Sequence, residues 1–287
     1  MQGLILAAGL GSRLKKLTKN QTKGMVEING ISMMERMLRQ LEQLDLNRIV
    51  IVTGYAADKL RYYIETLAIK TPILYIHNDI YDQTNNIYSV ALAEQVMSED
   101  DTLMLESDLI FEQGVLEEIV QDERPNLILV DKYQRWMDGT CVQLNAMDQI
   151  INFIPGAKFS YAEADNYFKT VNIYKLSKEF VIKYYFPFLK AYMTASGVNQ
   201  YYETVFETIC SLDKKAILAK RLERGKWYEV DDIQDLDIAE SIFAEPIQVL
   251  DKVANRYGGY WRYPKLLDYC YLVNPYFPPK QMIEEMK

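Results

Sequence analysis

Two patterns of apolar and polar positions alternate along residues 1–131. Short apolar runs predict buried strands, and stretches with apolar residues at three- and four-residue spacing predict amphipathic helices. The predicted strands cover residues 3–7, 48–53, 72–76, 102–106 and 127–131. The predicted helices cover residues 33–44, 58–67, 86–97 and 113–120, the first of them capped by Ser32. Strands that alternate with helices are typical of an α/β fold, here a doubly wound, mostly parallel, Rossmann-like sheet.

The pattern changes after about residue 139. Short strands joined by turns are expected over residues 140–144, 150–154 and 169–174, and they predict a small antiparallel extension beside the sheet. Helices over 177–192, 201–212 and 233–244 and strands over 216–219 and 226–230 complete a first domain, expected to span residues 1–245. Residues 246–287 are rich in aromatic residues and proline and show no strong periodicity, so we expect a linker and the start of a second domain there.

Composition excludes several classes of protein. The chain has 287 residues and a formal net charge of −8, which argues against a general nucleic-acid binder. No apolar run approaches the length of a membrane-spanning helix, so no membrane insertion is expected. Cys141, Cys210 and Cys270 lie far apart and lack metal-ligand spacing, so we expect reduced thiols and a cytoplasmic location.

The stretch from Leu4 to Leu14 carries the clearest chemical signal. A short apolar strand runs into a turn with Gly9 and Gly11, after which Ser12 and Arg13 open a helical segment. Glycines let backbone N–H groups approach a phosphate closely, and a helix start adds a positive dipole end. Arg13, Lys15, Lys16, Lys19 and Lys23 all precede the first acidic residue of the chain, Glu27. Concentrated positive charge on an anionic chain favours a small polyanion such as a nucleoside triphosphate.

Three other interpretations compete for this turn. A Rossmann dinucleotide fingerprint would place a third glycine where Leu14 stands, and residues 48–53 do not end in an acid that would bind a ribose. A P-loop would end in Gly-Lys-Ser or Gly-Lys-Thr, which is missing. An ordinary strand-to-helix turn with solvated lysines is the remaining alternative.

Two groups of acidic residues are candidate metal ligands. Glu106 and Asp108 stand at the end of a predicted strand, two residues apart and therefore on the same side. Glu229, Asp231 and Asp232 precede the last predicted helix. Carboxylate oxygens are the hard ligands that Mg2+ requires. The structural alternatives are a solvated strand end for the first group, and for Asp232 an N-cap with Asp235 in a capping box.

The pattern L-A-A-G-x-G-x-R-L with the downstream Lys23 resembles the nucleotidyltransferases that make nucleoside diphosphate sugars and CDP-alcohols. The resemblance implies a sheet of the nucleotidyltransferase type and Mg2+ held by Asp108 and Asp231, with Asp232 as the alternative to Asp231. It implies that Lys23 and Arg13 act on the phosphates. Thr22 and Gly24 depart from the prolines that usually flank the lysine. The residues expected to bind the nucleotide are Leu6, Ala7, Ala8, Gly9, Gly11, Ser12, Asn85, Asn86 and Ser107.

The segment over residues 81–89 resembles the part of choline-phosphate cytidylyltransferases near the base and the acceptor. Asparagine amides can pair with the amino and carbonyl edges of a pyrimidine, which favours CTP. Asn85 or Asn86 is also expected to cap the helix that follows. The only histidine, His77, is expected to be structural, because the reaction needs no general base when the acceptor is already ionised.

The acceptor is expected to be a small zwitterionic phosphonate or phosphate. Residues 132–140 bring an aromatic side chain, an acid and cations together. Trp136 and Tyr174 could face an ammonium group that Asp138 pairs with, unless the aromatic side chains only pack in the core. Lys132, Arg135 or Lys169 would take the anion. The residues expected to bind the acceptor are Glu106, Lys132, Trp136, Asp138, Tyr174 and Glu229.

Residues 258–262 and 272–279 resemble the opening of a PLP-dependent aminotransferase of the histidinol-phosphate type. An unrelated extended arm is the alternative. With the N-terminal motifs, the resemblance is to the 2-aminoethylphosphonate cytidylyltransferase part of a fused enzyme. It implies that CTP and 2-aminoethylphosphonate give the CMP conjugate and pyrophosphate. Choline phosphate, a sugar 1-phosphate, a regulatory nucleotide-binding module and a homo-oligomer formed through the C-terminal region stay open.

Overall fold

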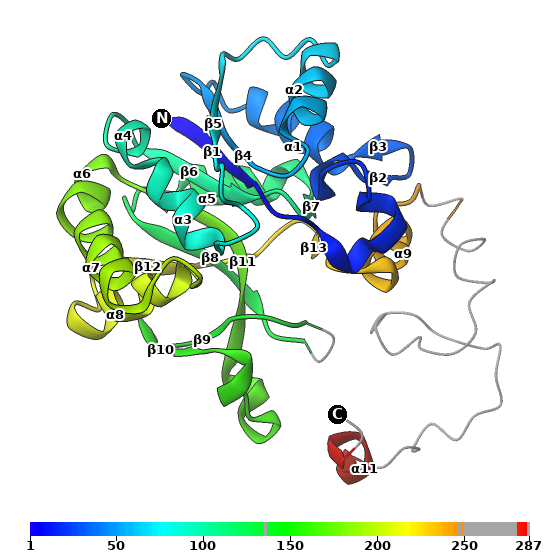
Figure 1. The fold of residues 1–287 in the computed structure, drawn as a ribbon. Helices are drawn as coiled ribbons and strands as arrows, with labels where there is room; N and C mark the ends of the chain where they lie inside the picture. The colour runs from blue at the N-terminus through cyan, green and yellow to red at the C-terminus, as the bar shows by residue number, and fades with distance from the viewer. Residues whose placement is uncertain (135–136, 246–247, 249–279, 286–287) are drawn as a thin grey trace, which may run out of the picture.

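The computed structural model describes residues 1–134, 137–245, 248 and 280–285. A nine-stranded sheet forms its centre, with helices on both faces (Figure 1). The strands β5 (Ile73–His77), β4 (Ile49–Thr53), β1 (Gln2–Ala7) and β6 (Thr102–Glu106) lie side by side in parallel. This arrangement confirms the mostly parallel α/β sheet.

One long strand of the central sheet is antiparallel to the strands on either side of it. β11 (Tyr167–Leu176) lies between β6 and β8 (Leu127–Lys132) and is antiparallel to both. β12 (Leu218–Arg221) then pairs with β8 in parallel. The sequence prediction assigned residues 169–174 to the extension alone, which is wrong. A strand pattern does not reveal where in a sheet the strand inserts.

The small antiparallel extension is confirmed as a hairpin at one end of β11. It consists of β9 (Cys141–Leu144) and β10 (Ile150–Ile154), and β9 pairs with the beginning of β11. The register between β11 and β8 shifts between Thr170 and Tyr174, where Asn172 has a φ of 61°. A bulge with a left-handed residue redirects side chains locally.

Alternate residues of the central strands pack into two hydrophobic layers, one on each face of the sheet. Leu4 and Leu6 pack toward α3 (Asn86–Leu92), α7 (Phe186–Ser196) and α8 (Glu203–Leu212). Ile5 packs toward the opposite layer, formed by α1 (Met33–Glu42), α2 (Ala57–Thr66) and α5 (Gln113–Gln121). This alternation is the reason that the short apolar runs become strands covered on both faces.

A third hydrophobic cluster supports α9 (Ile233–Ile242), which packs beside two short strand pairs. β7 (Leu109–Phe111) pairs with β13 (Trp227–Glu229), and β2 (Glu27–Ile28) pairs with β3 (Ile31–Ser32). Ser32 caps α1 as expected, accepting a hydrogen bond from the N–H of Glu35 at 3.0 Å. β7, β2 and β3 were not predicted, because two or three residues are too few to carry a period.

Several element boundaries differ from the sequence prediction. The helix expected over 86–97 breaks at Ala93, so that α4 (Glu94–Met97) is separate. The helix expected over 177–192 consists of α6 (Lys178–Phe180), a π-helical stretch over Val181–Tyr185 and then α7. A short helix, α11 (Lys280–Glu285), lies in the C-terminal segment (Figure 1). The aromatic motifs at 258–262 and 272–279 and Cys270 fall outside the described residues. Within the described residues, no helix has the length and apolar character needed to cross a membrane.

Candidate active site

The glycine turn leaves the carboxyl end of β1. A Cβ built on Gly9 meets no atom within 4 Å, so the turn is open at that point. Gly11 has a φ of +60°, and a Cβ there would approach the Lys23 Cβ to 3.0 Å. The segment that follows, Ser12–Thr18, is a kinked 3-10 helix with non-helical angles at Lys15. The dipole of a regular α-helix is therefore not available here, and the exposed backbone N–H groups of the turn are the remaining anion donors.

A cleft of about 510 Å³ lies in front of this turn. Its wall includes all nine residues expected to bind the nucleotide, from Leu6 to Ser107, together with Lys23, Arg13, Asp108 and Asp231. Asn85 is also the N-cap of α3, since its side chain accepts the N–H of Asn86 at 2.8 Å. The structure therefore brings the glycine turn, the asparagine pair and both metal-ligand candidates to one cavity.

The pairing of β7 with β13 brings the two acids together from distant parts of the chain. Asp108 lies in the turn between β6 and β7, and Asp231 lies between β13 and α9. The N–H of Val230 donates to the carbonyl oxygen of Asp108 at 2.9 Å, which links the two loops. Asp232 caps α9 in the predicted capping box, with its side chain on the N–H groups of Gln234 and Asp235.

Lys23 lies between Asp108 and Asp231. Its Nζ donates to Asp108 Oδ2 at 2.8 Å and to Asp231 Oδ1 at 2.7 Å, and the side chain is only 12% exposed. Arg13 Nη2 reaches the same Asp231 oxygen at 2.7 Å from a largely exposed position. Burial opposes the charge on Lys23, but the two carboxylates outweigh it and raise the pKa of Lys23. Burial alone would raise the pKa of Asp231, whereas Lys23 and Arg13 together hold it below its usual value.

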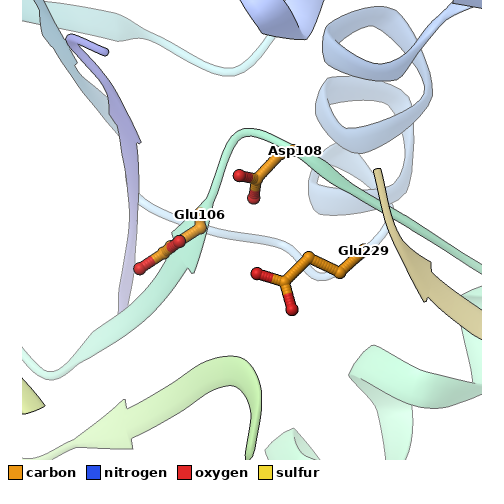
Figure 2. A group of neighbouring side chains, drawn as sticks. All are labelled: Glu106, Asp108 and Glu229. Carbon is orange, nitrogen blue, oxygen red and sulfur yellow. The ribbon is translucent and has the colours of Figure 1, made fainter. Parts of the chain in front are cut away.

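Three carboxylates, one of them that of Asp108, form an acidic cluster (Figure 2). Oxygens of Glu106, Asp108 and Glu229 lie within 4.8 Å of one another, which is compatible with a bound cation. Glu106 accepts a hydrogen bond from the Tyr202 hydroxyl at 2.7 Å. Burial, reinforced by the neighbouring carboxylates, raises the pKa of Glu106 and of Glu229. The predicted convergence of Glu106 and Asp108 is confirmed, although the strand ends at Glu106 and a turn carries Asp108.

Strand β11 carries two partners of Glu229. Lys169 Nζ lies 3.0 Å from Glu229 Oε2, and Asn172 donates to Glu229 Oε1 at 3.1 Å. The Lys169 side chain is only 2% exposed. Burial opposes its charge, but the pKa of Lys169 is raised because Glu229 outweighs the burial. Lys169 was a candidate for the acceptor's anion; here it neutralises an acid, so an anion would have to compete with Glu229.

A second, smaller cleft of about 110 Å³ adjoins the first and shares Arg13 and Asp231 with it. Asp138, Glu229 and Lys169 line it, together with Trp227. Asp138 therefore shares this cleft with Glu229 of the acidic cluster, and its contact with the acceptor stays a prediction.

Two predicted acceptor residues lie elsewhere. Tyr174 is 1% exposed and stacks on Phe206 at 5.1 Å in the core, so it does not face a ligand. Lys132 donates to the carbonyl oxygen of Asp165 and lies over the Phe168 ring. Tyr174 thus follows the alternative given for the aromatic side chains, packing in the core. The sequence did not separate these positions from acceptor contacts, because a strand-end aromatic or lysine has the same sequence pattern in either place. Trp136 and Arg135 lie outside the described residues.

Sequence reasoning missed the residues that α8 contributes. Glu203 and Tyr202 lie beside Glu106, and burial raises the pKa of Glu203 to about 7. The Glu203 Oε2 atom is buried and has no hydrogen-bond partner among the described residues. No motif marks these positions; only a buried acid at the start of an amphipathic helix could have drawn attention to them. His77 interacts with Thr53 and Asp79 outside this cluster.

The fold and the combined glycine turn, lysine and paired acids define a nucleotidyltransferase domain. The chain belongs to the MobA-like NTP transferase domain family, which matches residues 3–150. This membership confirms the resemblance to nucleotidyltransferases. The fusion with an aminotransferase stays a prediction.

Two curated relatives carry phosphonate names. The chain is 27% identical over 288 residues to the CMP-5'-(3-aminopropyl)phosphonate synthase of Streptomyces rubellomurinus, covering 100% of this chain and 46% of that protein. It is 33% identical over 107 residues to the 2-aminoethylphosphonate cytidylyltransferase of Lancefieldella rimae, covering 37% of this chain and 42% of that protein. The chain thus spans about half the length of the Streptomyces relative, and these relatives support a cytidylyltransferase of the phosphonate or phosphate kind.

Among solved structures, the chain resembles the CTP:phosphocholine cytidylyltransferase LicC of Streptococcus pneumoniae. The TM-score is 0.67 at 22% identity, and the match covers 84% of this chain and 98% of that one. At this identity the likeness shows the fold.

Proposed function

We propose that this domain is a cytidylyltransferase that joins CTP to 2-aminoethylphosphonate and releases pyrophosphate. The names of the Streptomyces and Lancefieldella relatives support an aminoalkylphosphonate as the acceptor. The observation that carries this choice of acceptor is the excess of acidic side chains around Lys23 and Lys169, here called the inner end of the site. The acceptor proposed for it has an ammonium at one end and an anion at the other.

The inner end of the site holds more acids than cations. Its carboxylates are those of Glu106, Asp108, Glu229 and Asp231, and Glu203, whose pKa burial raises to about 7, is a further buried acid beside Glu106. Against them stand the two enclosed ammonium groups of Lys23 and Lys169. Buried carboxylates need cationic partners or protons, so the site favours ligands that bring positive charge. A divalent cation together with one substrate ammonium meets that need.

The side chains that line the two clefts indicate which kind of substrate ammonium the site can bind. A primary ammonium has three N–H groups to donate, whereas a quaternary one relies on aromatic faces. The wall is rich in carboxylates, because Glu106, Asp108 and Asp231 line the larger cleft and Asp138 and Glu229 line the smaller one. Tyr174, which could have formed part of an aromatic cage, is in the core. An amine with N–H groups therefore suits this wall better than a choline head.

In the proposed reaction the phosphonate oxygen attacks the α-phosphorus of CTP in line, and the bond to pyrophosphate breaks. Two anions have to meet, so the enzyme contributes charge neutralisation and positioning. Arg13, Lys23 and the N–H groups of the glycine turn hold the phosphates. The acceptor oxygen is already ionised at neutral pH, so no general base is required.

Asp108 and Asp231 are the residues proposed to hold Mg2+. The fit is supported by Asp108 Oδ1, which is buried and has no hydrogen-bond partner among the described residues. When bound, the ion would supply further neutralisation at the α-phosphate. The asparagines at the start of α3 are proposed to contact the cytosine edge.

We propose that the catalytic domain ends near residue 245, just after α9, and that residues 246–287 form the linker and opening segment of a second domain. The nucleotide substrate and the free buried thiols of Cys141 and Cys210 support a cytoplasmic location.

Pyrophosphate release tests the proposed function directly. CTP, UTP, ATP and GTP are each combined with 2-aminoethylphosphonate, phosphoethanolamine, choline phosphate and glucose 1-phosphate, with Mg2+ present. We expect release with CTP and 2-aminoethylphosphonate at a kcat/KM at least about tenfold above that of choline phosphate, because each lost charged hydrogen bond costs about 1.5–3 kcal/mol. Phosphorus NMR identifies the mixed anhydride product.

Each other outcome of this assay has a definite meaning. Release with choline phosphate alone overturns the acceptor, and release with a sugar phosphate overturns the acceptor class. No release with any pair supports a nucleotide-binding module without turnover. Phosphoethanolamine, which has the same ammonium but a phosphate ester, separates recognition of the amine from recognition of the phosphonate.

A further inference from the structure

Lys23 makes contacts that a phosphate-binding lysine does not require. Its ammonium lies 2.8 Å from Asp108 Oδ2 and 2.7 Å from Asp231 Oδ1, the two side chains proposed as metal ligands. Among the described residues, the hydrogen bonds of this ammonium go to these two acids. The cation that bridges the two acids is therefore part of the chain itself.

A lysine ammonium and a divalent cation cannot share this position. Mg2+ binds carboxylate oxygens at about 2.0–2.1 Å, so an ion bridging the two oxygens that Lys23 contacts would overlap the ammonium. An ion bound through the other Asp108 oxygen, Oδ1, would lie beside the ammonium and be repelled by its charge. The Lys23 side chain is 12% exposed, and Asp108 and Asp231 are 15% and 22% exposed. An ammonium expelled from its acids within this enclosed space would lose its partners, which is costly for a buried charge.

Nucleotide phosphates would provide the missing partner. Lys23 and the glycine turn line the same cleft, and Gly11 packs against the Lys23 side chain. Triphosphate oxygens at this turn would accept the ammonium as it leaves the two carboxylates, and the vacated oxygens would then be free for the metal. The exchange replaces one cation by another at Asp108 and Asp231, so neither acid is left without a counter-charge.

We infer that Lys23 occupies the cation position of the nucleotide-free enzyme, excludes the divalent ion from it, and yields it when a triphosphate binds. Metal and nucleotide affinities are then positively coupled, and by linkage each ligand strengthens the other by the same factor. This inference rests on the metal role proposed above for the two aspartates. It adds that the free enzyme is in a metal-excluded state.

Binding of Mn2+ to the nucleotide-free protein, followed by the EPR signal of the free ion, tests the inference without turnover. The comparison uses the wild type, Lys23→Met, Lys23→Arg, and Lys19→Met as a control at an exposed lysine of the same basic segment. We expect Lys23→Met to bind Mn2+ at least about tenfold more tightly than the wild type, within the usual range of coupling between sites. Lys23→Arg, which keeps a cation there, and Lys19→Met should stay close to the wild type.

The effect of CTP on Mn2+ binding provides a second measurement. CTP, corrected for its own complex with Mn2+, should increase the affinity of the wild type for the ion more than it increases that of Lys23→Met. The inference is overturned if Lys23→Met binds Mn2+ no more tightly than the wild type. It is also overturned if wild-type protein binds the ion equally well with and without CTP, a result that does not depend on any variant folding.

A further variant separates this inference from the metal site on which it rests. Asp231→Asn in the Lys23→Met background should abolish the gained Mn2+ binding. If Mn2+ binding is unaffected by Asp231→Asn, the proposed metal site is wrong. If binding depends on Asp231 but not on Lys23, the metal site stands and only the competition by Lys23 fails.

Discussion

At the residue scale, the site is organised by charges that neutralise one another before any substrate arrives. Lys23 pairs with Asp108 and Asp231, and Lys169 pairs with Glu229. Each pair joins residues that are far apart in the sequence, so the fold has to be complete before the charges meet. The fold itself therefore brings the main catalytic candidates together.

Asp108→Ala and Asp231→Asn are expected to reduce kcat by on the order of a hundredfold or more, because each removes a preorganised charged ligand. Pyrophosphate release measured across Mg2+ concentrations checks this. Circular dichroism should show an intact fold for both variants. Near-full activity of either variant at low Mg2+ would exclude that residue as a metal ligand. Asp232→Asn is the matched control, because its carboxylate caps α9 instead of contacting Lys23.

At the scale of single elements, the start of α9 positions one of the two acids. Asp235 Oδ2 accepts the backbone N–H groups of Asp231 and Asp232, each at 3.1 Å, and Asp235 Oδ1 accepts the Tyr228 hydroxyl at 3.1 Å. The backbone that carries Asp231 is therefore held by the helix cap and by β13. Asp235 thus supports the site although it does not line the cleft that holds the predicted nucleotide-binding residues.

Asp235→Ala is expected to destabilise the domain by about 1 kcal/mol, as for loss of a helix cap, and to reduce kcat because Asp231 loses its support. Urea unfolding and the dependence of rate on Mg2+ measure the two effects. The Mg2+ concentration for half-maximal rate should rise in Asp235→Ala. Gln234→Ala, in the same helical turn, should leave both unchanged. If Asp235→Ala lowers stability alone, the cap has no role in positioning Asp231.

The elements also show what sequence reasoning can reach. The bounds of the parallel strands were predicted to within one or two residues, because a short uninterrupted apolar run between polar turns is typical of a buried strand. The glycine turn and the paired acids were found because their order along the chain is characteristic. The insertion of β11 between β6 and β8 was not found, because long-range pairing leaves no local trace. Glu203 was missed for the same reason: its importance comes from neighbours contributed by other elements.

At the scale of the whole molecule, buried acids make stability depend on pH. The folded protein keeps a proton on Glu203 up to about pH 7, whereas the unfolded chain releases it near 4.5. Between these values the folded state binds more protons, so its stability falls as the pH rises. Burial also raises the pKa of Glu106 and of Glu229, so both contribute in the same direction.

Glu203→Gln should therefore flatten the loss of stability between about pH 5 and pH 7 in the absence of ligands. Urea unfolding at several pH values measures the slope. Glu207→Gln, also on α8, is the control and should keep the slope of the wild type. An unchanged slope in Glu203→Gln would show that this carboxyl does not carry the proton.

The reversed strand β11 has a consequence for how such a domain can diversify. The segment shared with the MobA-like family, residues 3–150, carries the glycine turn and the asparagine pair, whereas Lys169 and Asn172 lie on β11 beyond it. The residues proposed to bind the nucleotide thus lie on the shared segment, whereas these two partners of Glu229 lie on a later strand that is joined to β6 by backbone hydrogen bonds. Substitutions on β11 can therefore change the surroundings of Glu229 without altering the residues proposed to contact the base.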